Sequence, residues 1–278
     1  MILRGDVLTE PRGRASESLQ MTSGMKVARA ARVARPYRMH AFLLVYSALL
    51  LYADGRFHTH RAQLVLGVVT FAVLCVCVRS APAARRAEIW VCVPVATVFE
   101  VFGSLIWGGY TYRFHNIPLY VPPGHALVYV FGITAASLPL VRAHERRVGH
   151  GVLVICTAWT IAGLTVLPLW THRVDASGAL IWPLFAWCIL RSGRPTLFAG
   201  IWLATATLEI AGTWAGDWVW HPLAPWTHLP SGNPPSAIAA GYAVIDGAVL
   251  LLAPRLTRAV RALAEIARAR RVAPSAVS

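Results

Sequence analysis

Eight apolar segments separated by short polar loops limit what this chain can fold into. A helix needs roughly 20 mostly apolar residues to cross the hydrocarbon core of a bilayer. Several segments approach that length, although the first and the sixth are shorter. We therefore predict an all-α integral membrane protein with about eight transmembrane helices, at residues 40–53, 62–78, 89–110, 125–141, 151–170, 178–190, 196–213 and 237–253.

The composition and the distribution of charge agree with this class. Hydrophobic residues make up 56% of the 278 residues and charged residues only 14%, against about 25% charged in a typical soluble domain. If both termini of an eight-helix chain lie inside, the inside segments carry 22 Lys and Arg residues and the outside loops carry four. Cytoplasmic loops of membrane proteins carry such an excess. We expect a multi-pass protein of a bacterial-type cytoplasmic (inner) membrane with both termini cytoplasmic.

The net charge of +14 does not require a nucleic-acid partner. Clustered basic residues can bind phosphates, but here the membrane topology accounts for their positions. We therefore expect no nucleic-acid partner and instead a membrane lipid or another lipophilic small molecule. The sequence leaves the oligomeric state open.

The two halves of the apolar region contain similar elements. Residues 99–103 match residues 208–212, and an aromatic-x-aromatic triplet follows in each half, at residues 110–112 and 218–220. A loop that ends in Pro-Pro and another helix complete each unit. Because two helices precede each unit, the pattern predicts a parallel tandem repeat of two four-helix halves. The alternative is chance similarity between apolar segments.

The predicted halves and tails divide the chain into four parts. Residues 1–38 form a basic cytoplasmic tail that we expect to be largely disordered, and residues 39–142 form the first four-helix half. Residues 143–254 form the second half, and residues 255–278 form another basic cytoplasmic tail. Arginines at helical intervals in the last part fit either an amphipathic helix on anionic headgroups or a solvated basic tail.

Three carboxylates lie inside predicted membrane helices. They are Glu100, Glu209 and Asp246, and the two glutamates hold equivalent places in the repeat. An aspartate at the centre of a spanning helix costs about 2.5–3.5 kcal/mol on insertion scales, so such groups face a bundle interior or a wet cavity. The functional hypothesis is that these carboxylates hold and deliver a proton. The structural alternative is that each is neutral or paired with a polar side chain and only joins helices.

Further candidate site residues surround the predicted carboxylates. His125 follows Pro-Pro-Gly at the start of a helix and is a candidate proton relay or ligand, although its counterpart in the repeat is about Ala237. Aromatic residues at the membrane boundary commonly anchor a helix in the interface. The alternative is that they bind a lipophilic substrate, and the candidates for this role are Trp107, Tyr110, Tyr112, Trp214, Trp218 and Trp220.

The sequence predicts no metal site and no cofactor. His58 and His60 form the only tight histidine pair, without a helical H-x-x-x-H pattern beside it. The five cysteines form no C-x-x-C pair, and we expect them to be small apolar packing residues. No phosphate-binding glycine loop or nucleophile-elbow motif occurs.

A set of short motifs resembles the polytopic membrane carotenoid hydratase family. The motifs are E-x-x-G at Glu100, G-G-Y-T-Y at residues 108–112, N-I-P-L-Y-V-P at residues 116–122 and W-x-W at residues 218–220, and the resemblance covers about 60 of the 278 residues. Proteins of that family add water to an acyclic carotenoid end group. The resemblance implies a membrane carboxylate that acts on an isoprenoid chain. The second Pro-Pro loop and His125 fall outside the pattern.

The leading hypothesis is therefore a membrane enzyme, hydratase-, lyase- or cyclase-like, that acts by acid–base chemistry on an isoprenoid, carotenoid or polyketide-like substrate. Glu100 would protonate a double bond or a leaving oxygen, and Glu209 or Asp246 would take up the complementary proton. Aromatic faces would stabilise a developing cation. The alternatives are a proton-coupled secondary transporter and a non-catalytic membrane scaffold.

Overall fold

The computed structural model describes residues 37–272, and most of them are helical. The predicted tail at residues 1–38 therefore lies almost wholly outside the described residues. The long helices are α2 (Arg38–Arg56), α3 (His60–Ser80), α4 (Arg86–Glu100), α5 (Val121–Ser137), α7 (Glu145–Thr165), α9 (Ala176–Arg191), α10 (Pro195–Ala215) and α11 (Ile238–Val272). The short elements are η2 (Ala83–Arg85), the π-helical turn η3 (Val101–Ile106), β1 (Tyr110–Tyr112), α6 (Pro139–Ala143), α8 (Pro168–Thr171) and β2 (Trp218–Trp220).

The predicted all-α class is confirmed, and each of the eight predicted segments contains a helix. Within residues 37–272, five helices are long and apolar enough to cross a membrane: His60–Ser80, Ala83–Ile106, Glu145–Thr165, Pro195–Ala215 and Ile238–Ile266. Helices α5 and α9 have only 17 and 16 residues, and α2 carries arginine at both ends. The apolar helices therefore indicate a multi-pass membrane protein, while the count of eight spans stays a prediction.

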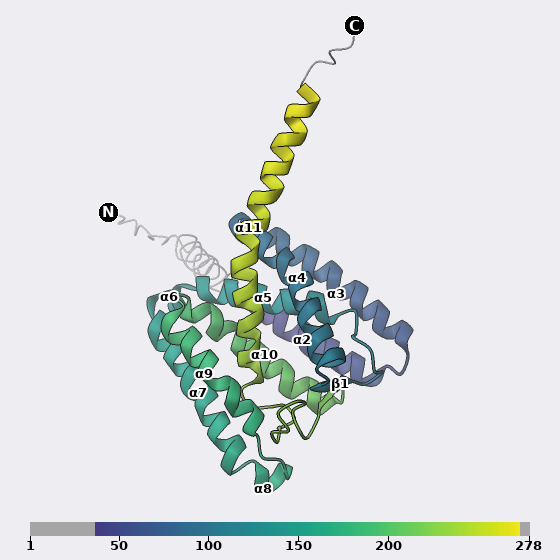
Figure 1. The fold of residues 1–278 in the computed structure, drawn as a ribbon, viewed down its shortest axis with the longest axis vertical. Helices are drawn as coiled ribbons and strands as arrows, with labels where there is room; N and C mark the ends of the chain where they lie inside the picture. Colours follow the sequence, from purple (N-terminus) through teal and green to yellow (C-terminus); the bar gives the residue numbers. More distant parts are fainter. Residues whose placement is uncertain (1–36, 273–278) are drawn as a thin grey trace, which may run out of the picture.

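Four helices form the centre of the bundle (Figure 1). Helix α5 packs against α4 and α10, and α11 packs against the same two helices. Helices α2 and α3 lie against α5 on one side, and α7 and α9 lie against α10 and α11 on the other. Side chains of α4, α5, α10 and α11 share one apolar core, so the central helices of the two predicted halves pack together.

A two-stranded ribbon, which the sequence did not predict, closes one end of this centre. Strand β1 pairs antiparallel with β2, with Tyr110 opposite Trp220, Thr111 opposite Val219 and Tyr112 opposite Trp218. Successive side chains of a strand point to opposite faces. The two tyrosines and two tryptophans are therefore on one face and buried, which directs four aromatic rings into the bundle.

Two buried aspartates fix the loops that lead into α5 and α11. Asp54, near the end of α2, accepts hydrogen bonds from Gln63 Nε2 and from the Tyr120 hydroxyl, both at 3.1 Å. Asp175 caps α9 by accepting from the Gly178 amide at 3.1 Å. It also accepts from the amides of Gly232 and Ser236 in the second proline-rich loop. Asp54 thus ties the first proline-rich loop to the turn between α2 and α3. Asp175 ties the second proline-rich loop to the start of α9.

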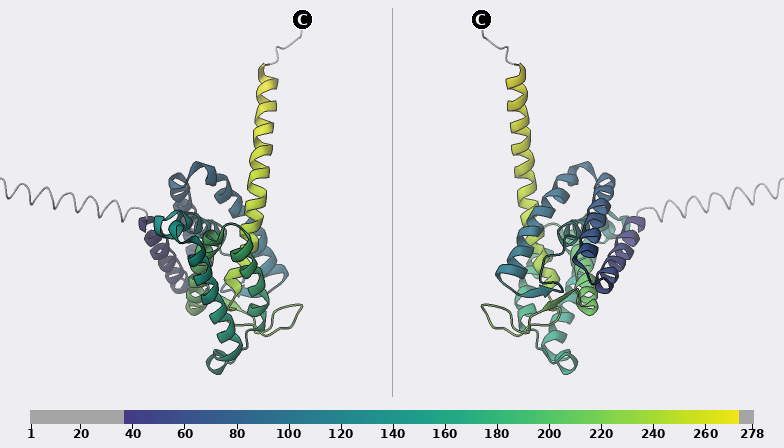
Figure 2. Two further views of the ribbon diagram at one scale, coloured as in Figure 1. Left: turned by 90° about the vertical axis from the view of Figure 1, so that its left-hand side faces the viewer. Right: turned by 90° about the vertical axis from the view of Figure 1, so that its right-hand side faces the viewer.

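Helix α11 continues past the bundle as one helix through the predicted basic tail (Figures 1 and 2). Its last turns expose both arginines and apolar side chains, including Leu256, Val260 and Leu263. The described part of the predicted tail at residues 255–278 is therefore helical, as one of the two interpretations of its arginine spacing requires.

Candidate functional site

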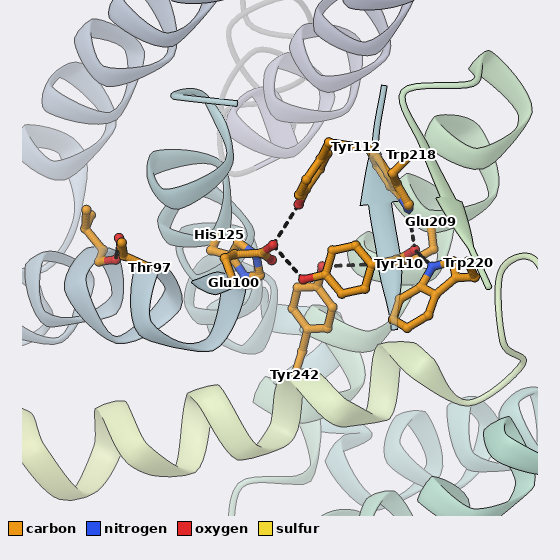
Figure 3. Close-up of polar contacts among 10 residues, drawn as sticks. Thr97, Glu100, Tyr110, Tyr112, His125, Glu209, Trp218, Trp220 and Tyr242 are labelled. Atoms are coloured by element: carbon orange, nitrogen blue, oxygen red, sulfur yellow. Dashed lines mark hydrogen bonds and ion pairs between the residues drawn. The ribbon is translucent and has the colours of Figure 1, made fainter. Parts of the chain in front are cut away.

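A cavity of about 280 Å³ lies between the ribbon and the helices α2, α4, α5, α10 and α11. Most of its wall is aliphatic or aromatic, and Glu100 and Glu209 both line it. His125, Tyr242 and the four aromatic residues of the ribbon line it too (Figure 3). The structure thus brings together both predicted glutamates, the predicted histidine and most of the predicted aromatic residues.

Glu100 is the last residue of α4 and is held by three side chains. Its Oε2 accepts hydrogen bonds from the hydroxyls of Tyr110 at 2.6 Å and Tyr112 at 2.7 Å. Its Oε1 lies 2.7 Å from Nε2 of His125. Tyr110 and Tyr112 reach the same oxygen because they are two residues apart on one strand face. Burial and the neighbouring Glu100 raise the pKa of Tyr112 well above its usual value, so this phenol stays neutral and donates.

Glu209 of α10 has an analogous set of donors. Its Oε2 accepts from Nε1 of Trp218 at 2.9 Å and Nε1 of Trp220 at 3.1 Å. Its Oε1 accepts from the Tyr242 hydroxyl at 3.3 Å. An indole N–H can only donate, so both tryptophans require Oε2 to act as an acceptor. A proton bound to Glu209 therefore sits on Oε1, the oxygen that faces Tyr242.

Ring contacts join the two carboxylate sites (Figure 3). The Tyr110 ring lies 4.5 Å from that of Trp220, and His125 stacks on Tyr242 with centroids 4.7 Å apart and planes at 14°. In each pair one member contacts Glu100 and the other contacts Glu209. The geometry of one carboxylate is thus coupled to that of the other.

A glycine three residues after each glutamate makes room for this arrangement. A Cβ on Gly212 would lie 2.0 Å from a ring carbon of Trp218, and a Cβ on Gly103 would lie 3.0 Å from the Tyr110 hydroxyl oxygen. The glycines therefore let the first aromatic residue of each strand lie across the helix and reach the carboxylate one turn earlier. This accounts for the E-x-x-G pattern in both halves.

Two predicted site residues lie away from the cavity. Trp214 is 89% exposed, because a residue five positions after Glu209 lies about 140° around the helix from it. Asp246 is buried but does not line the cavity. It is on α11 one turn beyond Tyr242, and its Oδ2 has no hydrogen-bond partner among the described residues. Of the other predicted residues, Trp107 lines the cavity and donates from Nε1 to the Pro225 carbonyl at 3.1 Å.

Tyr242 was not predicted from the sequence. The repeat pairs His125 with about Ala237, but Ala237 is buried in a separate apolar cluster. Tyr242, five residues later, takes the place against Glu209 that His125 takes against Glu100. The signal that the sequence offered for Tyr242 was its position four residues before Asp246, on the same helix face.

A second buried polar cluster lies beside the ribbon. Asp217 is 0% exposed, and neither of its carboxylate oxygens has a hydrogen-bond partner among residues 37–272. Burial, and next the nearby Asp54, raise the pKa of Asp217 to about 8, while Arg113 opposes the shift. Arg113 Nη2 is 3.3 Å from Asp54 Oδ2. Tyr120 connects the cluster to the cavity, because its hydroxyl donates to Asp54 and its side chain lines the cavity wall.

No three His, Cys, Asp or Glu side chains in the described part of the chain gather closely enough to hold a metal ion. The site therefore consists of carboxylates, phenols, indoles and one imidazole. Such groups hold, orient and transfer protons.

We expect Gly212→Ala to displace Trp218 from Glu209, because the added methyl group overlaps the indole. Overpacking of this kind costs roughly 1–3 kcal/mol. Thermal unfolding in detergent should show a lower Tm. Gly124→Ala is the matched control, because its Cβ would meet nothing within 4 Å on a helix that also borders the cavity. Equal unfolding temperatures for the two variants would contradict this role of Gly212.

We expect the Asp217 carboxyl to make stability pH-dependent. Its pKa is raised from 3.8 to about 8 by folding, so the folded state binds the proton more tightly than the unfolded state. The stabilisation is complete below about pH 4 and is lost as the pH rises through about 8, by at most about 1.4 kcal/mol per pH unit.

The measurement is the difference in unfolding temperature between wild type and Asp217→Asn from pH 5 to pH 9. The wild type should lose stability relative to the variant as the pH rises. Glu265→Gln, on the exposed end of α11, controls for loss of one acidic group and should run parallel to wild type. If the unfolding temperature of Asp217→Asn also runs parallel to that of wild type across this pH range, Asp217 does not titrate there.

The chain was also compared with known proteins. No protein-family model, curated protein or solved structure matches it. The resemblance to the carotenoid hydratases thus rests on the motif residues alone, and the function has to be argued from the geometry of the cavity.

Proposed function

We propose that this protein is an integral membrane enzyme that transfers protons to and from a lipophilic, unsaturated substrate. One observation carries the proposal: two buried glutamates, each fixed by three side chains, line the same largely apolar cavity. A cavity with so few polar groups suits an apolar ligand. The fixed carboxylates supply the chemistry, because acid–base catalysis requires a proton-carrying group held at a defined position.

Glu100 and His125 form the proton-donating pair in this proposal. The 2.7 Å contact between Glu100 Oε1 and His125 Nε2 lets the two groups share and exchange a proton. Tyr110 and Tyr112 fix the other carboxylate oxygen and so orient the donor. The proton is delivered to a double bond or to a leaving oxygen of the substrate.

Glu209 takes up the complementary proton. Its Oε2 is occupied by two indole donors, so Oε1 is the basic atom. Tyr242 donates to this oxygen over a longer distance, 3.3 Å, and can yield its place to a substrate or water proton. The π faces of the ribbon aromatics stabilise positive charge that develops between the two carboxylates.

Hydration is the reaction that the family resemblance favours. The proton from the Glu100–His125 pair bonds to one alkene carbon, and the other carbon becomes a cation. A water oxygen then bonds to that carbon and releases one proton to Glu209. The sum is the addition of one water molecule without oxidation or reduction. In a cyclase, an internal double bond attacks the cation instead, and Glu209 removes a proton from the product.

The approximate two-fold relation within the site supports the tandem repeat and the eight-helix topology that we propose for the chain. Glu100 corresponds to Glu209, Gly103 to Gly212 and β1 to β2. Both termini lie in the cytoplasm in this arrangement, and the membrane is a bacterial-type cytoplasmic membrane. The excess of basic residues in the inside segments supports the orientation.

The same relation favours a proton-coupled transporter as the second candidate. Transporters often place coupling carboxylates between related halves near the middle of the membrane. Such a carrier moves a lipophilic molecule unchanged, and its uptake stops when an uncoupler removes the proton gradient. An enzyme changes the chemical composition of the lipid extract instead.

The test compares wild type with Glu100→Gln and Glu209→Gln in a host that accumulates acyclic carotenoids. Mass spectrometry of extracted lipids should detect a product one water heavier, or an isomer, only with wild type. Each variant should lose roughly 100-fold or more of the product, the usual contribution of a positioned acid or base. Glu265→Gln, far from the cavity on α11, should keep the wild-type level.

Size-exclusion chromatography in detergent measures the folded amount of each variant. An amount equal to that of wild type shows that a loss of product does not come from misfolding. If folded wild type leaves the lipid and pigment profile unchanged, the hydratase proposal is wrong for this substrate class. Uncoupler-sensitive uptake would then identify the transporter, and the absence of both activities would leave the scaffold.

A further inference from the structure

A second, smaller cavity adjoins the first between α2, α5 and α10. Its volume is about 60 Å³. The two cavities share five wall residues, which are Ser47, Leu51, Leu127, Val128 and Leu208. The two cavities therefore lie side by side across these shared side chains, with the smaller one toward the outer face of α2.

The outer rim of the smaller cavity is at the side of the bundle. Leu44 and Ala48 of α2 and Thr207 of α10 are exposed there, and Ala211 is half-buried. Three of these four side chains are small, so the two helices leave a groove between them. The Thr207 hydroxyl donates to the Leu203 carbonyl at 2.8 Å within its own helix, which leaves its methyl group as an apolar surface. Among the described residues, none of those that line the groove is charged.

The groove faces lipid in a membrane-embedded bundle. On α2 the neighbouring side chains Val45 and Leu49 are exposed and aliphatic, as expected for a surface in contact with acyl chains. The ribbon lies at one end of the bundle, where its four aromatic rings form part of the cavity wall. The groove thus lies on the lateral face of the bundle, next to the wall of the main cavity.

The size of the main cavity indicates why such an opening is needed. Its volume of about 280 Å³ is just below the roughly 300–1,000 Å³ of pockets for small ligands. Such a space encloses the end of a long lipid but not the whole molecule. The remainder must leave through the wall, and the adjoining apolar groove provides the path.

We propose that the groove between α2 and α10 binds the hydrocarbon tail of a long-chain lipid whose reactive end lies between Glu100 and Glu209. The groove is also the path by which this lipid enters from the bilayer. The identity of the reactive end rests on the proposed function, whereas occupation of the groove by a hydrocarbon chain requires no reaction.

Photolabelling tests this proposal without turnover. Two probes are used, both long-chain fatty alcohols. The first carries a diazirine at the far end of its chain, and the second carries the diazirine near the hydroxyl. Purified protein in lipid nanodiscs is irradiated and the adducts are mapped by peptide mass spectrometry. We expect the probe with the diazirine at the far end of its chain to label residues of α2 and α10 around the groove. The probe with the diazirine near the hydroxyl should label cavity residues such as Tyr242.

Ala48→Trp and Ala211→Trp fill the groove from opposite helices. Each should lower labelling of the cavity roughly tenfold, equivalent to about 1.4 kcal/mol of binding free energy. Leu49→Trp is the matched control, because it adds the same ring on the lipid-facing side of α2, next to Ala48 and outside the groove. It should leave cavity labelling unchanged.

The outcomes separate this inference from the proposed function. Equal cavity labelling in Ala48→Trp and Leu49→Trp would overturn the groove as a tail site, even if Glu100→Gln abolishes product formation. Labelling that is blocked only by the groove variants would support it, even if no product is ever found. Ala48 is exposed, so its substitution tests the groove if Ala211→Trp fails to fold.

Discussion

The burial of two glutamates in an apolar bundle is the constraint on which the rest of this structure depends. A carboxylate inside a membrane helix is costly unless polar groups surround it. Among residues 37–272, the helices themselves supply only His125 and Tyr242, one for each glutamate. The remaining four donors come from the β1–β2 ribbon, with phenols for Glu100 and indoles for Glu209. The ribbon is therefore part of the polar site as well as the end of the bundle.

Other features follow from the need to bring the ribbon to the carboxylates. The π-helical turn η3 ends α4 directly after Glu100 and lets the chain return as β1. Gly103 and Gly212 admit the aromatic rings over their helices. Asp54 and Asp175 hold the proline-rich loops that lead back into α5 and α11. Because the strands are paired, a shift in one set of donors moves the other set as well.

The sequence predicted the helices and both glutamates because these features have strong local signals. Apolar runs identify membrane helices, and a lone carboxylate within such a run stands out. The ribbon had no such signal, since three-residue strands are too short for a periodic pattern.

Tyr242 was missed because it lies within an apolar helix and the loops before α5 and α11 differ in register. Trp214, a candidate for substrate binding, lies outside the cavity, because composition near a glutamate does not give the direction of a side chain. Asp217 acquires its environment through burial next to Asp54 of α2 and Arg113, both far away in the sequence.

The central claim is that the two glutamates transfer protons to and from carbon or oxygen atoms of a lipid held between them. The most direct measurement is deuterium incorporation in cells grown in D₂O after the substrate has been supplied already formed. Proton delivery by the Glu100–His125 pair predicts one carbon-bound deuterium in each hydrated or cyclised product molecule, and neither label nor product with Glu100→Gln. A product that forms in wild type without carbon-bound deuterium would contradict protonation of a double bond by the Glu100–His125 pair and with it the proposed hydration.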